Sequence, residues 1–303
     1  MKIGIIQTRP GIGDICIFLP FIHLISKFYK LRVCLFTKKR SAAKEILKDD
    51  PFIQKVIYID ENNEKSLNKN LYYEIKKNEI NKIFIFHFGI RYWLISFFAG
   101  VKNIKFYGIF KRDVSITGYL RSSLMKWLNI DNIKYECKIY LNSIKKNKSI
   151  IIGIGGSGPA KKWCIQNYIK LIELINILNS EFQFVIAGGN QEIEDFKKIK
   201  NDLPNINFKN LCELSISDCM DILNQAELYI GNDTGFMHIC GSLNIPSFGI
   251  FGNTPNDYCD YNELLFPIMP DGYKKVGFQS DALDIITPDY VYKFIKNKGN
   301  YFG

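Results

Sequence analysis

Residues 150–158 read IIIGIGGSG, a run of isoleucines that passes directly into a glycine-rich turn. A continuous apolar run of this length, bounded by glycine, is typical of a buried parallel strand. The turn also fits the G-x-G-x-x-G spacing of dinucleotide-binding proteins, at Gly153, Gly155 and Gly158. Pro159 and the segment 161–163 (KKW) separate these glycines from the next helical pattern, so the match to that motif is weak.

Strand-length apolar runs alternate with helix-length amphipathic stretches on both sides of this turn. In the first half, we expect strands at 2–7, 31–36, 55–59 and 82–86, and helices near 14–29, 41–48 and 66–77. The second half has expected strands at 150–154, 182–187, 228–230 and 246–251, and helices at 165–178, 192–201, 217–225 and from 234 onward. The polar, basic segment 143–149 is the expected linker. The pattern predicts an α/β protein with two Rossmann-like, doubly wound domains, whose ligands bind at the carboxyl ends of the strands.

The composition excludes several classes of protein and points to a charged partner. The 303 residues are 47% hydrophobic and 14% aromatic, which rules out collagen-like, coiled-coil and disordered chains. Residues 1–149 carry 28 basic and 12 acidic side chains, whereas residues 150–303 carry 12 and 18. A basic half suits an anionic membrane surface or a phosphorylated glycolipid, although a general excess of lysine explains the charge equally well. No nucleic-acid-reading motif accompanies the charge, so we do not expect a nucleic-acid partner.

The cysteines and the apolar runs indicate the cellular compartment in which the protein is expected. The eight cysteines are scattered without a C-x-x-C pair, so we expect reduced core cysteines rather than disulfides or a zinc site. The longest apolar run, 15–25, contains Pro20 and His23 and is shorter than the roughly 20 residues that span a bilayer. No small-residue cleavage site follows it, and we therefore expect a cytoplasmic protein. The apolar stretch 92–98 is expected as a buried core helix, with membrane contact as the alternative.

Three loops at predicted strand ends carry candidate functional residues. The first, 7–14 (QTRPGIGD), permits a tight turn at Gly11 and Gly13 and places Asp14 at the start of a helix. Because an aspartate there also serves as a helix cap, a structural role and a functional role for Asp14 both stay open.

The other two loops belong to the second half and suit a phosphate-bearing ligand. In one, a glycine-rich turn is followed by Lys161, although a solvated basic turn would look the same. In the other, 231–238 (GNDTGFMH), Asp233 and Thr234 can cap the next helix. The backbone N–H groups of Thr234 and Gly235 then remain available to a diphosphate. His238 lies one helical turn after Thr234, where a packed structural histidine is the alternative.

Taken together, these loops resemble the bacterial heptosyltransferase family, glycosyltransferase family 9. The resemblance spans almost the whole chain, and the Asn232-Asp-Thr-Gly-x-x-His238 block is its most specific part. The other motifs that carry it are Arg9 with Ile12-Gly13-Asp14 and Pro20, Lys161-x-Trp163 with Tyr168, Phe251-Gly-x-Thr254, and Ile286-Thr-Pro288.

The resemblance implies a GT-B fold, with two Rossmann-like, doubly wound domains facing a central cleft. Residues 1–145 would bind the acceptor, residues 146–285 would bind the nucleotide sugar, and residues 286–303 would form a final helix and tail packing back toward the N-terminal domain. It also implies inverting transfer of a heptose from ADP-heptose to a lipopolysaccharide or lipooligosaccharide core acceptor. No cofactor and no metal are expected, and no Asp-x-Asp pair stands in a loop suited to a metal-dependent transferase.

The resemblance and the positions of the residues in these loops together indicate individual roles. By resemblance, Asp14 would be the catalytic base, on a loop with Arg9, Gly11 and Gly13 that faces the acceptor. On the donor side, Lys161 and the N–H groups of Thr234 and Gly235 would stabilise the leaving ADP. Asp233 would hold sugar hydroxyls, His238 would support the phosphate or the loop, and Glu192 would bind ribose, unless it is an ordinary surface glutamate.

Other functions remain open at this stage. A transferase of the same type could use another nucleotide sugar or a non-lipid acceptor. An NAD(P)-dependent oxidoreductase and a non-catalytic nucleotide-sugar-binding module are remote alternatives. Peripheral contact of the basic half with the cytoplasmic face of the anionic inner membrane is compatible with its charge.

Overall fold

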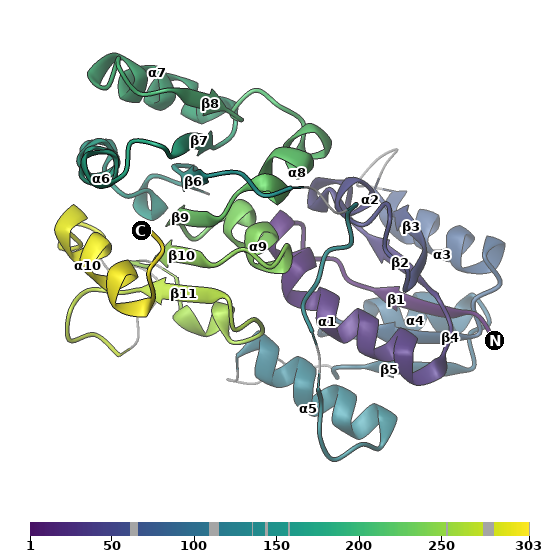
Figure 1. Cartoon of the computed structure of the whole chain (residues 1–303). Helices are drawn as coiled ribbons and strands as arrows, with labels where there is room; N and C mark the ends of the chain where they lie inside the picture. The colour runs from purple at the N-terminus through teal and green to yellow at the C-terminus, as the bar shows by residue number, and fades with distance from the viewer. Residues whose placement is uncertain are drawn as a thin grey trace. The chain divides into compact units, whose positions relative to one another are not determined.

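A five-stranded parallel sheet forms the centre of the first domain in the computed structural model, with strand order β3-β2-β1-β4-β5 (Figure 1). Its strands are β1 (Ile3–Ile6), β2 (Val33–Thr37), β3 (Ile53–Tyr58), β4 (Lys82–Ile85) and β5 (Asn103–Phe106). On one face lie α1 (Ile12–Tyr29) and α5 (Ile116–Leu128), which contact each other. The other face carries α3 (Leu67–Lys77) and α4 (Arg91–Phe98), and α2 (Ala43–Ile46) follows β2.

A six-stranded parallel sheet forms the second domain, with strand order β11-β10-β9-β6-β7-β8. Its strands are β6 (Ser149–Gly153), β7 (Gln183–Ala187), β8 (Phe208–Asn210), β9 (Leu228–Asn232), β10 (Ser247–Ile250) and β11 (Leu265–Ile268). Its helices are α6 (Ile165–Leu178), α7 (Ile193–Asp202), α8 (Ile216–Gln225), α9 (Gly235–Ser242) and α10 (Pro288–Lys298). The chain divides into two compact domains, Met1–Leu141 and Asn142–Gly303, and the assignment of the first to the acceptor and the second to the nucleotide sugar stays a prediction. The structure describes residues 1–60, 66–108, 115–134, 136–142, 145–156, 158–252, 254–274 and 282–302.

The predicted α/β class is confirmed, and each predicted strand matches an observed one within about two residues. Three observed strands had no counterpart in the sequence prediction: β5, β8 and β11. All three lie at sheet edges, where side chains are only partly buried and the apolar run is short or interrupted. Pro267 lies inside β11, and proline is tolerated in sheets chiefly on edge strands.

Helix α10 has its buried face in the second domain. The expected packing of this final helix back toward the N-terminal domain stays a prediction. Val291 and Ile295 are fully buried in the core of that domain, and α10 packs against α6. The helix begins as expected after Ile286, because Thr287 accepts a hydrogen bond from the N–H of Tyr290 and Pro288 occupies the first turn.

Helix α4 also corrects an expectation. The stretch 92–98 is helical, but it is not a buried core helix: Tyr92 and Ser96 are buried, whereas Phe97 and Phe98 are exposed.

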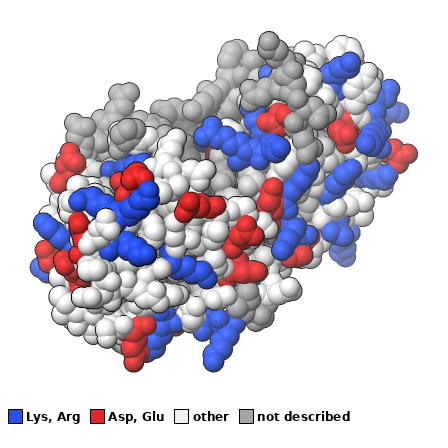
Figure 2. Space-filling view, turned by 90° about the horizontal axis from the view of Figure 1, so that it is seen from above, with Lys and Arg blue, Asp and Glu red and all other residues white. Residues whose placement is uncertain are grey.

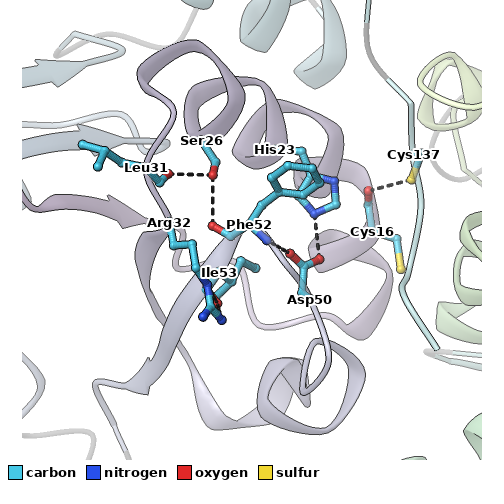
Figure 3. Close-up of polar contacts among 9 residues, drawn as sticks. All are labelled: Cys16, His23, Ser26, Leu31, Arg32, Asp50, Phe52, Ile53 and Cys137. Carbon is cyan, nitrogen blue, oxygen red and sulfur yellow. Dashed lines mark hydrogen bonds and ion pairs between the residues drawn. The ribbon is translucent and has the colours of Figure 1, made fainter. Parts of the chain in front are cut away.

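A buried polar pair anchors α1, the helix whose first turn carries Asp14 (Figure 3). His23 is 2% exposed, and its Nε2 lies 2.7 Å from Oδ2 of Asp50, which is equally buried. Oδ1 of Asp50 accepts the N–H of Phe52, so both oxygens of this buried carboxylate have a hydrogen-bond partner. By length and composition alone, α1 could cross a membrane, yet 61% of it is buried inside the protein, as is usual for a core helix.

All eight cysteines are free, as expected, and seven of them are buried. Burial raises the pKa of Cys219 to about 11 and that of Cys212 to about 12, with nearby carboxylates adding to the shift. These thiols therefore stay protonated at neutral pH, which fits a packing role.

Candidate functional site

The strand order places two loops of the second domain side by side. Strand β7 lies on one side of β6 and β9 on the other, so the chain direction across the sheet reverses between β6 and β9. Doubly wound sheets bind ligands at this switch point, outside the carboxyl ends of the strands. The glycine-rich turn after β6 and the segment 231–238 after β9 both lie there. The two strand ends approach so closely that a Cβ on Gly231 would overlap the backbone of Gly153.

Asn232 joins these loops, and it is completely buried. Its amide Nδ2 donates to the carbonyl oxygens of Ile154 and Gly155, at 3.1 and 2.9 Å. Its Oδ1 accepts the backbone N–H of Trp163 at 3.0 Å, and the indole N–H of Trp163 donates to the carbonyl of Ile286. One side chain therefore fixes the turn after β6 and the segment that follows Lys161. The sequence prediction included Asn232 only as part of a motif and missed this connecting role.

The two neighbouring lysines of this segment differ in their partners. Nζ of Lys162 lies 2.5 Å from Oε1 of Glu192, whose other oxygen accepts the N–H of Gly189 at 2.7 Å. Glu192 is 4% exposed, so it is not an ordinary surface glutamate. Lys161 is half-buried and forms no ion pair with any residue that the structure describes. Of the two ammonium groups, that of Lys161 is therefore the one available to an anionic ligand.

The first turn of α9 supplies backbone hydrogen-bond donors at the same carboxyl ends of the strands. The helix begins at Gly235 after Thr234, and no residue in the described ranges accepts a hydrogen bond from the N–H of either. Free N–H groups at a helix N-terminus, together with the helix dipole, favour an anion. The hydroxyl of Thr234 lies 3.2 Å from that of Tyr229, which is itself bonded to the carbonyl of Asn232.

His238 is a packed residue with two partners. Its Nε2 lies 3.2 Å from Oδ1 of Asp233, and its Nδ1 lies 2.8 Å from the hydroxyl of Tyr261. The ring is 4% exposed. This contact fixes the carboxylate of Asp233 beside the first turn of α9, so the geometry gives His238 a positioning role. Tyr261 was missed by the sequence prediction, since nothing in the spacing links it to His238.

The first domain has its own switch point, between β1 and β4. The loop after β1 carries Arg9, Gly11 and Gly13, and Asp14 is the third residue of α1. Oδ1 of Asp14 lies 2.6 Å from Nε of Arg9, and Oδ2 accepts the N–H of Gly11 at 3.1 Å. Asp14 therefore caps the helix from inside its first turn and stays 15% exposed.

The loops after β4 and β5 bring further residues to the carboxyl ends of the strands of the first sheet, and the sequence prediction missed these residues. Nδ1 of His87 lies 3.4 Å from the hydroxyl of Thr8. Burial lowers the pKa of His87, and Arg91 and Lys38 lower it further. Tyr107 directly follows β5, and its buried hydroxyl has no hydrogen-bond partner among the described residues. Burial raises the pKa of Tyr107 well above its ordinary value.

Surface charge and metal ligands add little to this site. On the face drawn in Figure 2, Lys and Arg side chains form several separate groups with Asp and Glu between them, rather than one continuous basic stripe. Within the described ranges, no group of three or more His, Cys, Asp or Glu side chains is arranged to hold a metal ion. Metal independence stays a prediction.

Comparison with known proteins agrees with this arrangement. The family model described as glycosyltransferase family 9 (heptosyltransferase) matches residues 109–265, more than half of the chain. The lipopolysaccharide heptosyltransferase 1 of Campylobacter coli is 23% identical, over 90% of each chain. The solved structure of the Escherichia coli ADP-heptose lipopolysaccharide heptosyltransferase II superposes with a TM-score of 0.75 at 16% identity, over 98% of each chain. The E. coli heptosyltransferase WaaC with ADP-2-deoxy-2-fluoro heptose gives a TM-score of 0.76 at 14% identity, over 99% of this chain and 100% of the other. The chain thus has the GT-B fold of these enzymes and belongs to glycosyltransferase family 9, the heptosyltransferases.

Proposed function

We propose that this enzyme transfers a heptose from ADP-heptose to a lipopolysaccharide core acceptor, with inversion at the anomeric carbon and without a bound metal. The observation that carries the proposal is the second domain's switch point. There, Asn232 joins two loops that present the ammonium group of Lys161 and the N–H groups at the start of α9, which have no ion-pair or hydrogen-bond partner among the described residues. This is a site for a diphosphate. The relative solved with an ADP-heptose analogue favours ADP as the nucleotide.

In this mechanism the acceptor hydroxyl attacks the anomeric carbon on the side opposite the leaving ADP. The carboxylate of Asp14 takes the proton from that hydroxyl, a step worth roughly 10²–10⁴ in rate. Arg9 and the N–H of Gly11 hold the carboxylate in place before reaction. The departing diphosphate gains negative charge, and Lys161 with the N–H groups of Thr234 and Gly235 stabilises it electrostatically.

The remaining donor-side residues orient the sugar nucleotide. Asp233, which contacts His238, would accept hydrogen bonds from sugar hydroxyls. Glu192, in the short helical turn that follows β7 and beside Gly155, would accept them from the ribose. We place the reaction on the cytoplasmic face of the inner membrane, with peripheral contact between the protein and that membrane, because the acceptor is a glycolipid.

Nucleotide-dependent thermal stabilisation of the purified protein tests the donor. A nucleotide at ~100 times its dissociation constant adds about 2.7 kcal/mol of stability. We expect ADP to raise the melting temperature and UDP, GDP, CMP and NAD to leave it unchanged. Lys161→Ala should reduce the ADP shift, whereas Lys209→Ala, a surface change on edge strand β8, serves as the matched control. Stabilisation by UDP or GDP alone would contradict the ADP-heptose donor, and stabilisation by NAD alone would contradict the proposed reaction.

A further inference from the structure

Helix α4 of the first domain carries an apolar stripe that faces solvent. Ile90, just before the helix, is 45% exposed, and Leu94 is 37% exposed. Phe97 and Phe98 are 55% and 69% exposed. Positions 90, 94, 97 and 98 recur with the period of an α-helix, so these side chains share one face.

The opposite face of α4 is already occupied. Tyr92 and Ser96 are buried, Tyr92 belongs to the core that includes α3, and Ser96 donates to the carbonyl of Tyr92. A surface helix packed on one side normally presents polar residues on the other. The stripe is therefore surplus to the folding of the domain, and exposed apolar surface of this kind marks an interaction site.

A hollow of about 550 Å³ adjoins the stripe, and its lining is apolar except for one lysine. It is lined by Trp93, Phe97, Gly100, Val101, Lys102 and Ile104. The rings of Trp93 and Phe97 stack almost parallel, with centroids 5.3 Å apart. An apolar hollow with aromatic walls and an ammonium group among them matches an acyl chain and an anionic headgroup.

The charges around the stripe select an anionic partner. Residues 90–102, which span the stripe and the turn after it, include two basic side chains, Arg91 and Lys102, and no Asp or Glu. Arg91 lies in the first turn of α4 and Lys102 follows the end of the helix, and both are exposed. A second copy of this chain would place the same basic side chains opposite one another in a two-fold interface, which opposes dimer formation through this face.

We propose that the stripe Ile90–Leu94–Phe97–Phe98 inserts into the surface of an anionic phospholipid bilayer, with Arg91 and Lys102 at the lipid phosphates. The inference rests on the proposed function in one respect, since a glycolipid acceptor is presented in a membrane. It adds the surface by which the enzyme reaches that membrane.

Vesicle flotation of the full-length protein tests the proposal. We expect binding to vesicles of phosphatidylglycerol and phosphatidylethanolamine, and much weaker binding to phosphatidylcholine vesicles. The variant Leu94→Gln/Phe97→Gln/Phe98→Gln should lose at least tenfold in partition coefficient and keep its melting temperature, because these side chains are exposed. The matched control is Ile177→Gln/Leu178→Gln at the end of α6, where the side chains are 80% and 56% exposed.

Two further readouts locate the contact. Arg91→Gln and Lys102→Gln should each reduce the partition coefficient about fivefold, the equivalent of about 1 kcal/mol per basic side chain at an anionic surface. Vesicles with brominated acyl chains should quench part of the tryptophan fluorescence of the wild-type protein. That quenched component should be absent from the Trp93→Phe variant.

Three outcomes would overturn the proposal: no binding of the wild-type protein to anionic vesicles, an equal loss in the α6 control, or a concentration-dependent dimer that only the α4 variant abolishes. Heptose transfer to a deacylated, soluble core acceptor should be unchanged in the α4 variant. A failure of the wild-type protein in that assay would count against the proposed function, whereas the vesicle result stands independently of it.

Discussion

Asn232→Ala should destabilise the second domain more than any surface change. The side chain is fully buried and makes three hydrogen bonds, one to the N–H of Trp163 and two to the carbonyls of Ile154 and Gly155. At about 1 kcal/mol for each bond, the substitution should cost about 3 kcal/mol of unfolding free energy. For a domain of this size, that lowers the melting temperature by about 6–12 °C.

Urea unfolding in a Trp93→Phe/Trp127→Phe background measures this cost in the second domain alone. Trp163 is the third of the three tryptophans and the only one in that domain, so its fluorescence reports on the loops that Asn232 joins. The ADP affinity should fall as well, because the turn after β6 and the Lys161 segment lose their common anchor.

The control for this experiment is Asn224→Ala. Its amide donates one exposed hydrogen bond, to the carbonyl of Asn142, and its loss should cost less than about 0.5 kcal/mol. A cost below about 1 kcal/mol for Asn232→Ala, or an equal cost for the two variants, would refute the role assigned to Asn232.

Three more outcomes follow from the geometry. Lys161→Ala should weaken ADP binding by about tenfold to a hundredfold, the value of a charge-assisted hydrogen bond, with little loss of stability. Lys162→Ala should instead cost about 2 kcal/mol of stability, because the buried Glu192 loses its partner. Isothermal titration measures the first effect and urea unfolding the second. Tyr107→Phe should raise the free energy of unfolding by about 1 kcal/mol, because it removes a buried hydroxyl without a partner in the described part of the chain. A lower free energy of unfolding in urea would contradict this prediction. The pKa of His87 is lowered in the folded protein, so the stability that neutral His87 contributes is complete above pH 6.5, the ordinary pKa, and is lost as the pH falls through the lower folded pKa. His87→Asn should therefore flatten the dependence of the melting temperature on pH below 6.5. An unchanged slope would contradict this prediction.

The sequence predicted the central strands well, because buried parallel strands are continuous apolar runs. Strands such as β1 and β6 have no exposed residue within their bounds, so local composition alone identifies them. The edge strands β5 and β8 give no such signal. The residues of β5 and β8 are exposed or half-buried, and only their neighbours β4 and β7 make them strands.

The candidate site was predicted in part. Glycine-rich turns and helix starts can be located from local sequence. The structure has one group of predicted residues beyond the carboxyl ends of the strands of the second sheet: Lys161, Glu192, Asp233, Thr234, Gly235 and His238. The other group lies beyond the carboxyl end of β1 in the first sheet: Arg9, Gly11, Gly13 and Asp14. The contacts between distant segments were not predicted. The Asn232–Trp163 and His238–Tyr261 pairs depend on which strands are neighbours, which the order of residues in the chain does not reveal.

The helix prediction for 92–98 was correct, but the burial prediction was not. Hydrophobicity indicated a core position, although the domain has room for only one face of α4. Periodicity identifies the faces of a helix, but which face is covered depends on the neighbouring helices.

Acceptor-dependent release of ADP from ADP-heptose, measured for the wild-type protein and for Asp14→Asn, tests directly whether Asp14 is the catalytic base. We expect the wild-type protein to turn over and Asp14→Asn to lose roughly 10²–10⁴ in rate while binding ADP normally, because the donor-side loops lie in the second domain. Asp60→Asn is the matched control, since Asp60 also accepts a backbone N–H in the first domain, that of Lys39. An Asp14→Asn protein that turns over within tenfold of the wild-type rate would contradict the account and leave Asp14 as a helix cap.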